Sequence, residues 1–182
     1  MEPTRRQFAL GAAAFAASLG EVRVAVAAQQ SDAAVLDKLL ALELLLALAY
    51  RRALGSGLLT AATESTVGGL LEHELAHASV LEAELRRLGV APTHSAAAVS
   101  GVDPARAALH DQRDALHLLA AAEAAAEAAY FGAMSKLGDG SLARTAAEIM
   151  ACEAQHATQI SELLHPGDVE RAVPGAYVQG RG

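Results

Sequence analysis

The amino-acid sequence predicts an all-α protein, a four-helix bundle made of two duplicated helical hairpins joined by a crossover. Apolar residues make up 53% of the 182 residues, but aromatic residues make up only 3%. This composition favours closely packed, alanine-rich helices over a β-sandwich, which needs β-branched and aromatic side chains. Glycine and proline punctuate four long helical segments, and the chain length suits one domain.

The first hairpin consists of two segments separated by a short turn. The first segment covers residues 31–54, with Ser31 or Asp32 as its N-terminal cap, and a Gly-Ser-Gly turn ends it. The second segment runs from about Thr60 to Arg87, where Gly89 ends it. Because the link between them is short, we expect the two helices to be antiparallel neighbours.

The second hairpin follows a linker over residues 91–102, which is rich in turn-forming residues and is the predicted crossover. Asp103 caps the third segment, and Pro104 takes its first position. That segment extends to Lys136, either continuously or with a break near residues 110–113. The fourth segment covers residues 141–165, and residues 167–182 are predicted to be a tail with no periodic apolar pattern.

Residues 1–30 are predicted to be a signal peptide of the twin-arginine type. Arg5 and Arg6 precede a short apolar run over residues 9–20, and small residues at 25–28 resemble a cleavage site. Glu21 and Arg23 depart from this pattern, and an ordinary amphipathic start is the alternative. The apolar run is too short for a stable membrane span, so we expect a mature periplasmic or extracellular protein.

Charge and cysteine content exclude several classes of function. The net charge is −7 and no basic stripe is present, which argues against binding of nucleic acid. Cys152 is the only cysteine, so no internal disulfide can form and no paired-cysteine metal motif exists. We expect Cys152 to serve as a small packing residue.

Glu43 is the only charged residue between Leu39 and Tyr50. A helix this apolar on all sides is buried, and a buried carboxylate needs a cation, a hydrogen-bond donor or a metal ion. Glu123 lies in a similar alanine-rich stretch. A tyrosine follows each glutamate by seven residues, Tyr50 in the first half and Tyr130 in the second.

The remaining charged residues repeat in the same way. Glu74 and His77 form one E-x-x-H motif, and Glu153 and His156 form another. Glu123 follows Glu43 by 80 residues, and the second motif follows the first by 79. The two halves therefore look like an internal duplication, which predicts a pseudo-two-fold bundle.

The doubled motif predicts a site for two metal ions. Residues i and i+3 share a helix face, so each motif offers one oxygen and one nitrogen to the same cluster. Four carboxylates nearly neutralise two divalent ions, and two imidazoles complete the ligands. This donor set suits iron or manganese better than structural zinc.

Residues 73–77 also match H-E-x-x-H, the zinc-peptidase motif, in which His73 and His77 would bind zinc and Glu74 would act as base. The repeat keeps the glutamate and the second histidine but has Cys152 at the position of His73. We therefore expect His73 to face solvent or a neighbouring helix. A third E-x-x-H, Glu162 to His165, points to the opposite face of its helix.

These motifs resemble those of the ferritin-like superfamily, specifically exported bacterial proteins related to rubrerythrin, bacterioferritin and manganese catalase. The resemblance covers residues 32–165, and the ferritin-like bundle is predicted to span residues 31–166. It implies terminal ligands at Glu43 and Glu123, bridging ligands at Glu74 and Glu153, and nitrogen ligands at His77 and His156. Glu127 has no counterpart in the first half, and a second-shell base or a rim charge is favoured over an extra ligand.

The expected function is an exported di-metal carboxylate protein that binds two iron or manganese ions and reacts with O₂ or peroxide. Tyr50 and Tyr130 would supply hydrogen bonds at the site. Metal sequestration without turnover and a metal-free structural or partner-binding bundle are the alternatives, with a zinc peptidase as a minor one. Whether the protein is an enzyme stays open, and a homodimer is compatible with the sequence.

Overall fold

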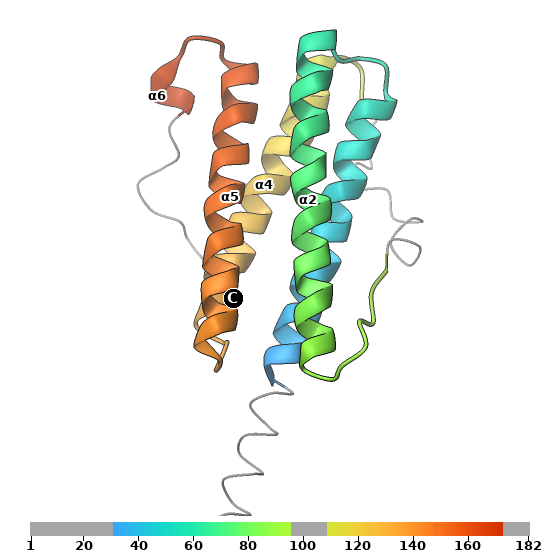
Figure 1. Cartoon of the computed structure of the whole chain (residues 1–182). Helices are drawn as coiled ribbons and strands as arrows, with labels where there is room; N and C mark the ends of the chain where they lie inside the picture. Colours follow the sequence, from blue (N-terminus) through green and yellow to red (C-terminus); the bar gives the residue numbers. More distant parts are fainter. Residues whose placement is uncertain (1–30, 96–108, 173–182) are drawn as a thin grey trace, which may run out of the picture.

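The computed structural model describes residues 31–95 and 109–172, which form four long helices and one short helix (Figure 1). No strand occurs among these residues, and the predicted four-helix bundle is confirmed. The predicted signal peptide, the cap at Asp103 and Pro104, and the last ten residues lie outside the described ranges.

The helices begin and end near the glycine and capping residues of the sequence. The first helix occupies residues 31–55, α2 spans Ala61–Arg87, and α5 spans Gly140–Leu164. Helix α4 covers Gln112–Met134, so a helix begins where the sequence allowed a break. A short helix that the sequence did not predict, α6 (Val169–Ala172), follows α5.

Local caps explain where these helices begin. The side chain of Thr60 accepts a hydrogen bond from the backbone N–H of Thr63 at the start of α2. Asp111 accepts one from the N–H of Asp114 at 2.8 Å, which makes it the cap of α4. Such caps satisfy backbone donors that have no partner inside the helix. Gly89, with φ of +74°, ends α2 in the left-handed conformation that glycine tolerates.

Helices α2 and α4 run in the same direction (Figure 1). Their starts meet where the backbone N–H of Thr60 donates to Gln112 Oε1 at 2.8 Å. The other end of α2 lies near the α4–α5 turn, where Arg87 Nη2 is 3.6 Å from Asp139 Oδ2. The end of α2 and the start of α4 therefore lie at opposite ends of the bundle, as a crossover between the two hairpins requires.

Asp32 is 3% exposed and lies at the start of the first helix. Its Oδ1 accepts a hydrogen bond from the N–H of Gly138 at 2.7 Å, and its Oδ2 accepts one from Asp139 at 3.0 Å. Asp32 binds the first helix to the turn between α4 and α5.

The apolar core is divided into two clusters by a charged layer. In α2, α4 and α5 a buried glutamate lies between the residues of one cluster and those of the other, and in the first helix Glu43 lies next to Leu44, the last buried residue of the first cluster. The first cluster includes Leu36, Leu40, Leu81, Leu85 and Leu142, and the second includes Val67, Leu70, Leu116, Leu119 and Ile160. Both clusters exclude water from the layer between them.

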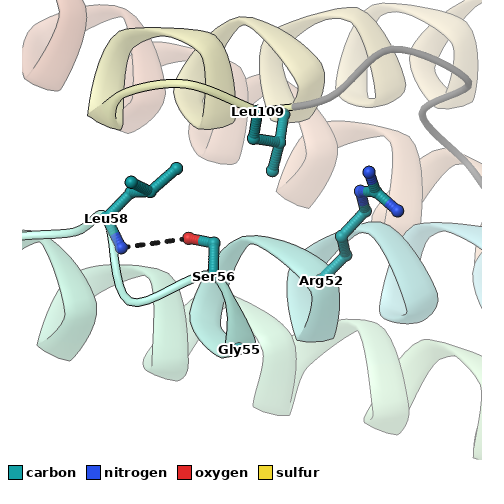
Figure 2. Close-up of a pocket in the computed structure, with 5 residues that line it drawn as sticks. All are labelled: Arg52, Gly55, Ser56, Leu58 and Leu109. Atoms are coloured by element: carbon teal, nitrogen blue, oxygen red, sulfur yellow. Dashed lines mark hydrogen bonds between the residues drawn. The ribbon is translucent and has the colours of Figure 1, made fainter.

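Away from this layer, an open pocket of about 480 Å³ lies beside the turn after the first helix (Figure 2). Arg52, Gly55, Ser56, Leu58 and Leu109 line it, and the N–H of Leu58 donates to Ser56 Oγ at 3.2 Å. These residues include neither a carboxylate nor an imidazole.

Among the described helices, none is both long and apolar enough to span a membrane.

Candidate metal centre

Each long helix contributes one fully buried glutamate to the centre of the bundle. Glu43 comes from the first helix, Glu74 from α2, Glu123 from α4 and Glu153 from α5, and all four are 0% exposed. In α2 and α5, buried apolar residues recur every three or four positions on either side of the glutamate. The same periodicity that builds the core therefore points the carboxylates inward.

His77 faces three of these carboxylates. Its Nδ1 lies 2.9 Å from Glu153 Oε1, 3.6 Å from Glu74 Oε2 and 3.7 Å from Glu43 Oε2. Only 11% of the His77 side chain is exposed. The first half of the chain therefore gathers its own glutamates around this nitrogen together with one from the second half.

His156 makes the equivalent arrangement in the second half. Its Nδ1 lies 2.7 Å from Glu74 Oε1, 3.4 Å from Glu153 Oε2 and 3.7 Å from Glu123 Oε1. The imidazole is 1% exposed. The two histidines thus share Glu74 and Glu153 but differ in the third carboxylate.

The six residues form two overlapping groups that could hold metal ions. One group contains Glu43, Glu74, His77 and Glu153, and the other contains Glu74, Glu123, Glu153 and His156. Within each group one donor atom per residue lies within 4.8 Å of all the others. Glu74 and Glu153 belong to both groups, which is the position that bridging ligands require. Glu43 and Glu123 each belong to one, as terminal ligands would.

Eight side-chain atoms at this centre are buried and accept or donate no hydrogen bond within the described residues. They are Glu43 Oε2, both oxygens of Glu74, Glu123 Oε2, both oxygens of Glu153, and Nδ1 of His77 and His156. The nitrogens and oxygens approach one another closely without the alignment of a hydrogen bond. Buried polar atoms are rarely left in this state, so their lone pairs fit cations placed between them.

Four of the six side chains at the centre have raised pKa values. Burial raises the pKa of Glu43 to about 8 and that of Glu123 to about 10, with the adjacent carboxylates adding to the effect. Burial lowers the pKa of an imidazole, but the facing carboxylates outweigh it and raise the pKa of His77 to about 12 and that of His156 to about 10.

The two shared carboxylates behave differently from the other two. Burial acts on them as well, but the two imidazoles outweigh it and hold the pKa of Glu153 at about 2 and the pKa of Glu74 below its usual value. Near neutral pH, two carboxylates are therefore ionised and two are protonated. Two imidazolium ions balance the ionised pair.

Each of the two tyrosines forms a hydrogen bond with the glutamate of the other half of the chain. Tyr50, on the first helix, donates its hydroxyl hydrogen bond to Glu123 on α4, and Tyr130 on α4 donates to Glu43. Each tyrosine lies in a different apolar cluster and reaches the charged layer from its own side. Burial, with the facing carboxylate, raises the pKa of both phenols, so they remain neutral donors. The sequence predicted that the tyrosines supply hydrogen bonds, but not this exchange of partners between the two halves.

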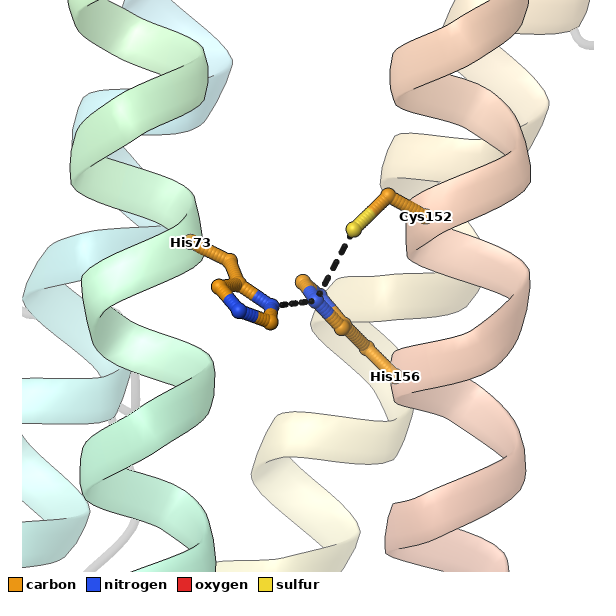
Figure 3. A group of neighbouring side chains, drawn as sticks. All are labelled: His73, Cys152 and His156. Atoms are coloured by element: carbon orange, nitrogen blue, oxygen red, sulfur yellow. Dashed lines mark hydrogen bonds between the residues drawn. The ribbon is translucent and has the colours of Figure 1, made fainter.

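His73 and Cys152 contact the outer side of His156 (Figure 3). His73 projects from α2 and its Nδ1 lies 3.0 Å from His156 Nε2. The Cys152 sulfur lies 3.3 Å from the same nitrogen. His73 is exposed and faces the neighbouring helix, as expected. Cys152 is half-buried, and its contact with His156 was missed because a packing role was expected.

Glu127 and Glu162, like His94 and His117, belong to none of the groups of potential metal ligands among the described residues. Glu127 is half-buried. His94 Nδ1 is 3.1 Å from Asp37 Oδ2, and His117 Nε2 accepts from Arg113. Glu162, of the third E-x-x-H motif, is exposed and accepts the N–H of Gly167.

The geometry of residues 73–77 does not match the zinc-peptidase interpretation. Among the described residues, no group of potential metal ligands contains both His73 and His77. His77 points its Nδ1 to the carboxylates, whereas His73 contacts His156 from outside.

Comparison with known proteins agrees with this fold. No curated protein matches the sequence significantly. A conserved hypothetical protein from Mycobacterium tuberculosis has a similar structure, with a TM-score of 0.66 and 20% sequence identity. The similarity covers 74% of this chain and 98% of that one, and at this identity it shows the fold alone. The sequence profile of the ferritin-like domain matches residues 31–166. The chain therefore belongs to the ferritin-like domain family.

Proposed function

We propose that this protein is an exported di-metal carboxylate protein that binds two iron or manganese ions and reacts with O₂ or peroxide. One observation carries the proposal: eight buried donor atoms without hydrogen bonds surround two overlapping positions in the middle of the bundle. Carboxylates with imidazoles are the donors that iron and manganese accept in such bundles.

The six residues would hold the two ions in two different roles, as bridging ligands and as ligands of one ion. Glu74 and Glu153, which face both histidines, would bridge the ions, and Glu43 with His77 or Glu123 with His156 would complete each position. Four carboxylates balance the charge of two divalent ions, so loading leaves the buried layer neutral. Bound there, redox-active ions would give electrons to a small oxidant and become oxidised, or would give and take back electrons in turn when peroxide disproportionates.

Tyr50 and Tyr130 orient the terminal carboxylates. Each hydroxyl donates to one oxygen of Glu123 or Glu43 and leaves the second oxygen free to face a metal ion. As neutral phenols, the tyrosines keep this geometry over the physiological pH range.

A small oxidant suits the surroundings of the centre. The two apolar clusters close it from both ends, and the ligand carboxylates are completely buried. The open pockets at residues 52–58 and 111–116 are lined by other residues. Carboxylates that are fully buried among the described residues favour a small oxidant such as O₂ or peroxide over a large organic substrate.

Export through the twin-arginine pathway is part of the proposal and rests on the sequence of residues 1–30. This route carries folded proteins, which suits a site loaded with metal before export. The protein would then act in the periplasm or outside the cell.

Metal analysis of protein produced in its native host, combined with O₂ and peroxide consumption, tests the proposal. We expect about two ions of iron or manganese per chain and consumption that requires them. Replacing His77 or His156 with alanine should remove at least half of the metal, whereas His165→Ala, in the unused third motif, should not. Full occupancy without consumption would indicate sequestration, and a metal-free native protein would overturn the proposal.

A further inference from the structure

A second donor cluster lies directly outside the carboxylate centre. It consists of His73, Cys152 and His156, each of which offers one ligand atom within 4.8 Å of the other two (Figure 3). The inner nitrogen of His156 faces carboxylates, but the outer nitrogen faces only sulfur and nitrogen donors in this group. The two sides of one imidazole therefore offer different chemistry.

The duplication explains why these residues meet. His73 and Cys152 each precede the glutamate of an E-x-x-H motif, so they are equivalent positions in the two halves. Helices α2 and α5 bring the two motifs face to face, and the imidazoles of His77 and His156 lie with their centres 5.9 Å apart. Residues one position before each motif consequently converge on the same side of the pair.

The two distances from His156 Nε2 are close to those around a small tetrahedral ion. With bonds of about 2.0 Å to nitrogen and 2.3 Å to sulfur, tetrahedral angles place two nitrogens roughly 3.3 Å apart and a nitrogen and sulfur roughly 3.5 Å apart. The observed separations are 3.0 Å between the nitrogens and 3.3 Å between His156 Nε2 and the sulfur. A shift of a few tenths of an ångström would seat the ion.

We propose that His73, Cys152 and the outer nitrogen of His156 form a separate binding site for a thiophilic cation of the Zn²⁺ class. A thiolate with two imidazoles is a donor set for zinc rather than for manganese or magnesium. Cys152 binds as the thiolate and releases its proton to solvent. The exposed His73 gives the ion access from outside, and a water molecule completes the fourth position.

Occupation of this outer site affects the carboxylate centre, and this consequence rests on the proposed function. A neutral imidazole has a lone pair on only one nitrogen. When Nε2 of His156 binds the outer ion, Nδ1 carries the proton and points it at Glu74 Oε1, 2.7 Å away. His156 then cannot bind an ion at the centre, so the outer ion and one inner ion compete, and the competition is reciprocal.

Titration of the purified, metal-free protein with Co²⁺ tests the outer site directly. Cobalt replaces zinc and gives a near-ultraviolet thiolate-to-metal charge-transfer band only when sulfur is bound. We expect this band in the wild type and its loss in Cys152→Ser, with affinity at least tenfold lower in His73→Ala. The control His165→Ala, in the unused third motif, should keep the band. Absence of the band, or unchanged affinity in His73→Ala, would overturn the site.

A competition experiment tests the link to the centre. One equivalent of Zn²⁺ added before manganese should lower manganese content from about two ions per chain to about one, and should have no such effect in Cys152→Ser. Equal manganese loading of both proteins after zinc would overturn the competition. If the wild type shows the cobalt band but never binds iron or manganese, the proposed function fails and the outer site stands.

Discussion

In the metal-free protein, protons occupy four of the six side chains of the centre. At neutral pH, Glu43, Glu123, His77 and His156 are protonated because their pKa values are raised to between about 8 and 12. Glu74 and Glu153 are ionised. The four protons thus compensate a charge that two divalent ions would compensate instead, and metal binding must displace them.

Loading with two Mn²⁺ ions should therefore release close to four protons per chain at pH 7. Because Mn²⁺ is not oxidised under anaerobic conditions, the release reports binding alone. Calorimetry in buffers with different ionisation enthalpies measures this number. Affinity should rise with pH across the neutral range, and release of one proton or none would contradict the protonation described for the centre.

Removal of either tyrosine hydroxyl should destabilise the metal-free protein by a similar amount. Tyr50→Phe leaves Glu123 without its donor, and Tyr130→Phe leaves Glu43 without its donor. The loss of a buried hydrogen bond costs about 1–3 kcal/mol. Urea unfolding of both variants at one pH measures their free energies of unfolding. A large effect in one half and none in the other would contradict the equivalence of the two bonds.

At the scale of the helices, local signals in the sequence predicted most boundaries. Helix α2 begins after Thr60 and α5 ends before His165 because the caps and stop signals act within a few residues. The partner of Asp32 could not be predicted in this way, since it lies 106 residues away in the chain. Helix α6 was missed because four residues carry no periodic pattern, and it is held by Ser161, whose hydroxyl donates to the carbonyl of Arg171.

Asp32→Ala should destabilise the bundle by about 2 kcal/mol or more, because two backbone N–H groups lose their acceptor. Asp32→Asn keeps one acceptor oxygen and should lose roughly half as much. Chemical unfolding of the two variants beside the wild type measures the difference. If Asp32→Ala unfolds with the wild-type midpoint, the bond between the first helix and the α4–α5 turn contributes nothing to stability.

Across the whole molecule, the duplication determined how much of the site could be predicted. The doubled Glu and E-x-x-H pattern indicated all six residues that the structure gathers into the two groups. The exchanged tyrosine bonds and the approach of Cys152 to His156 were not predicted. The tyrosine exchange depends on how the first helix and α4 face each other, and the sulfur contact depends on which side of the ring faces the carboxylates; neither is specified by spacing within one helix.

The charged layer also makes global stability depend on pH. Glu43 and Glu123 have raised pKa values in the folded protein, and so do His77 and His156. Unfolded, these carboxylates titrate near 4.5 and the imidazoles near 6.5. Between pH 4.5 and about 8 the folded protein therefore binds more protons than the unfolded chain, and its stability falls as pH rises. Below pH 4.5, the lowered pKa of Glu153 means that the folded protein binds fewer protons than the unfolded chain, so stability rises with pH.

The metal-free protein should consequently melt at a higher temperature at pH 5 than at pH 8. Each extra proton is worth about 1 kcal/mol per pH unit, so the difference over this range should reach several kcal/mol. Saturating Mn²⁺ should invert the order, because ions bind the deprotonated side chains and bind them more tightly at pH 8. Glu123→Gln removes one titrating group and should make the metal-free protein less sensitive to pH. Thermal unfolding at both pH values, with and without Mn²⁺, distinguishes these cases. A metal-free protein that is more stable at pH 8 would mean that the four carboxylates do not share one buried layer.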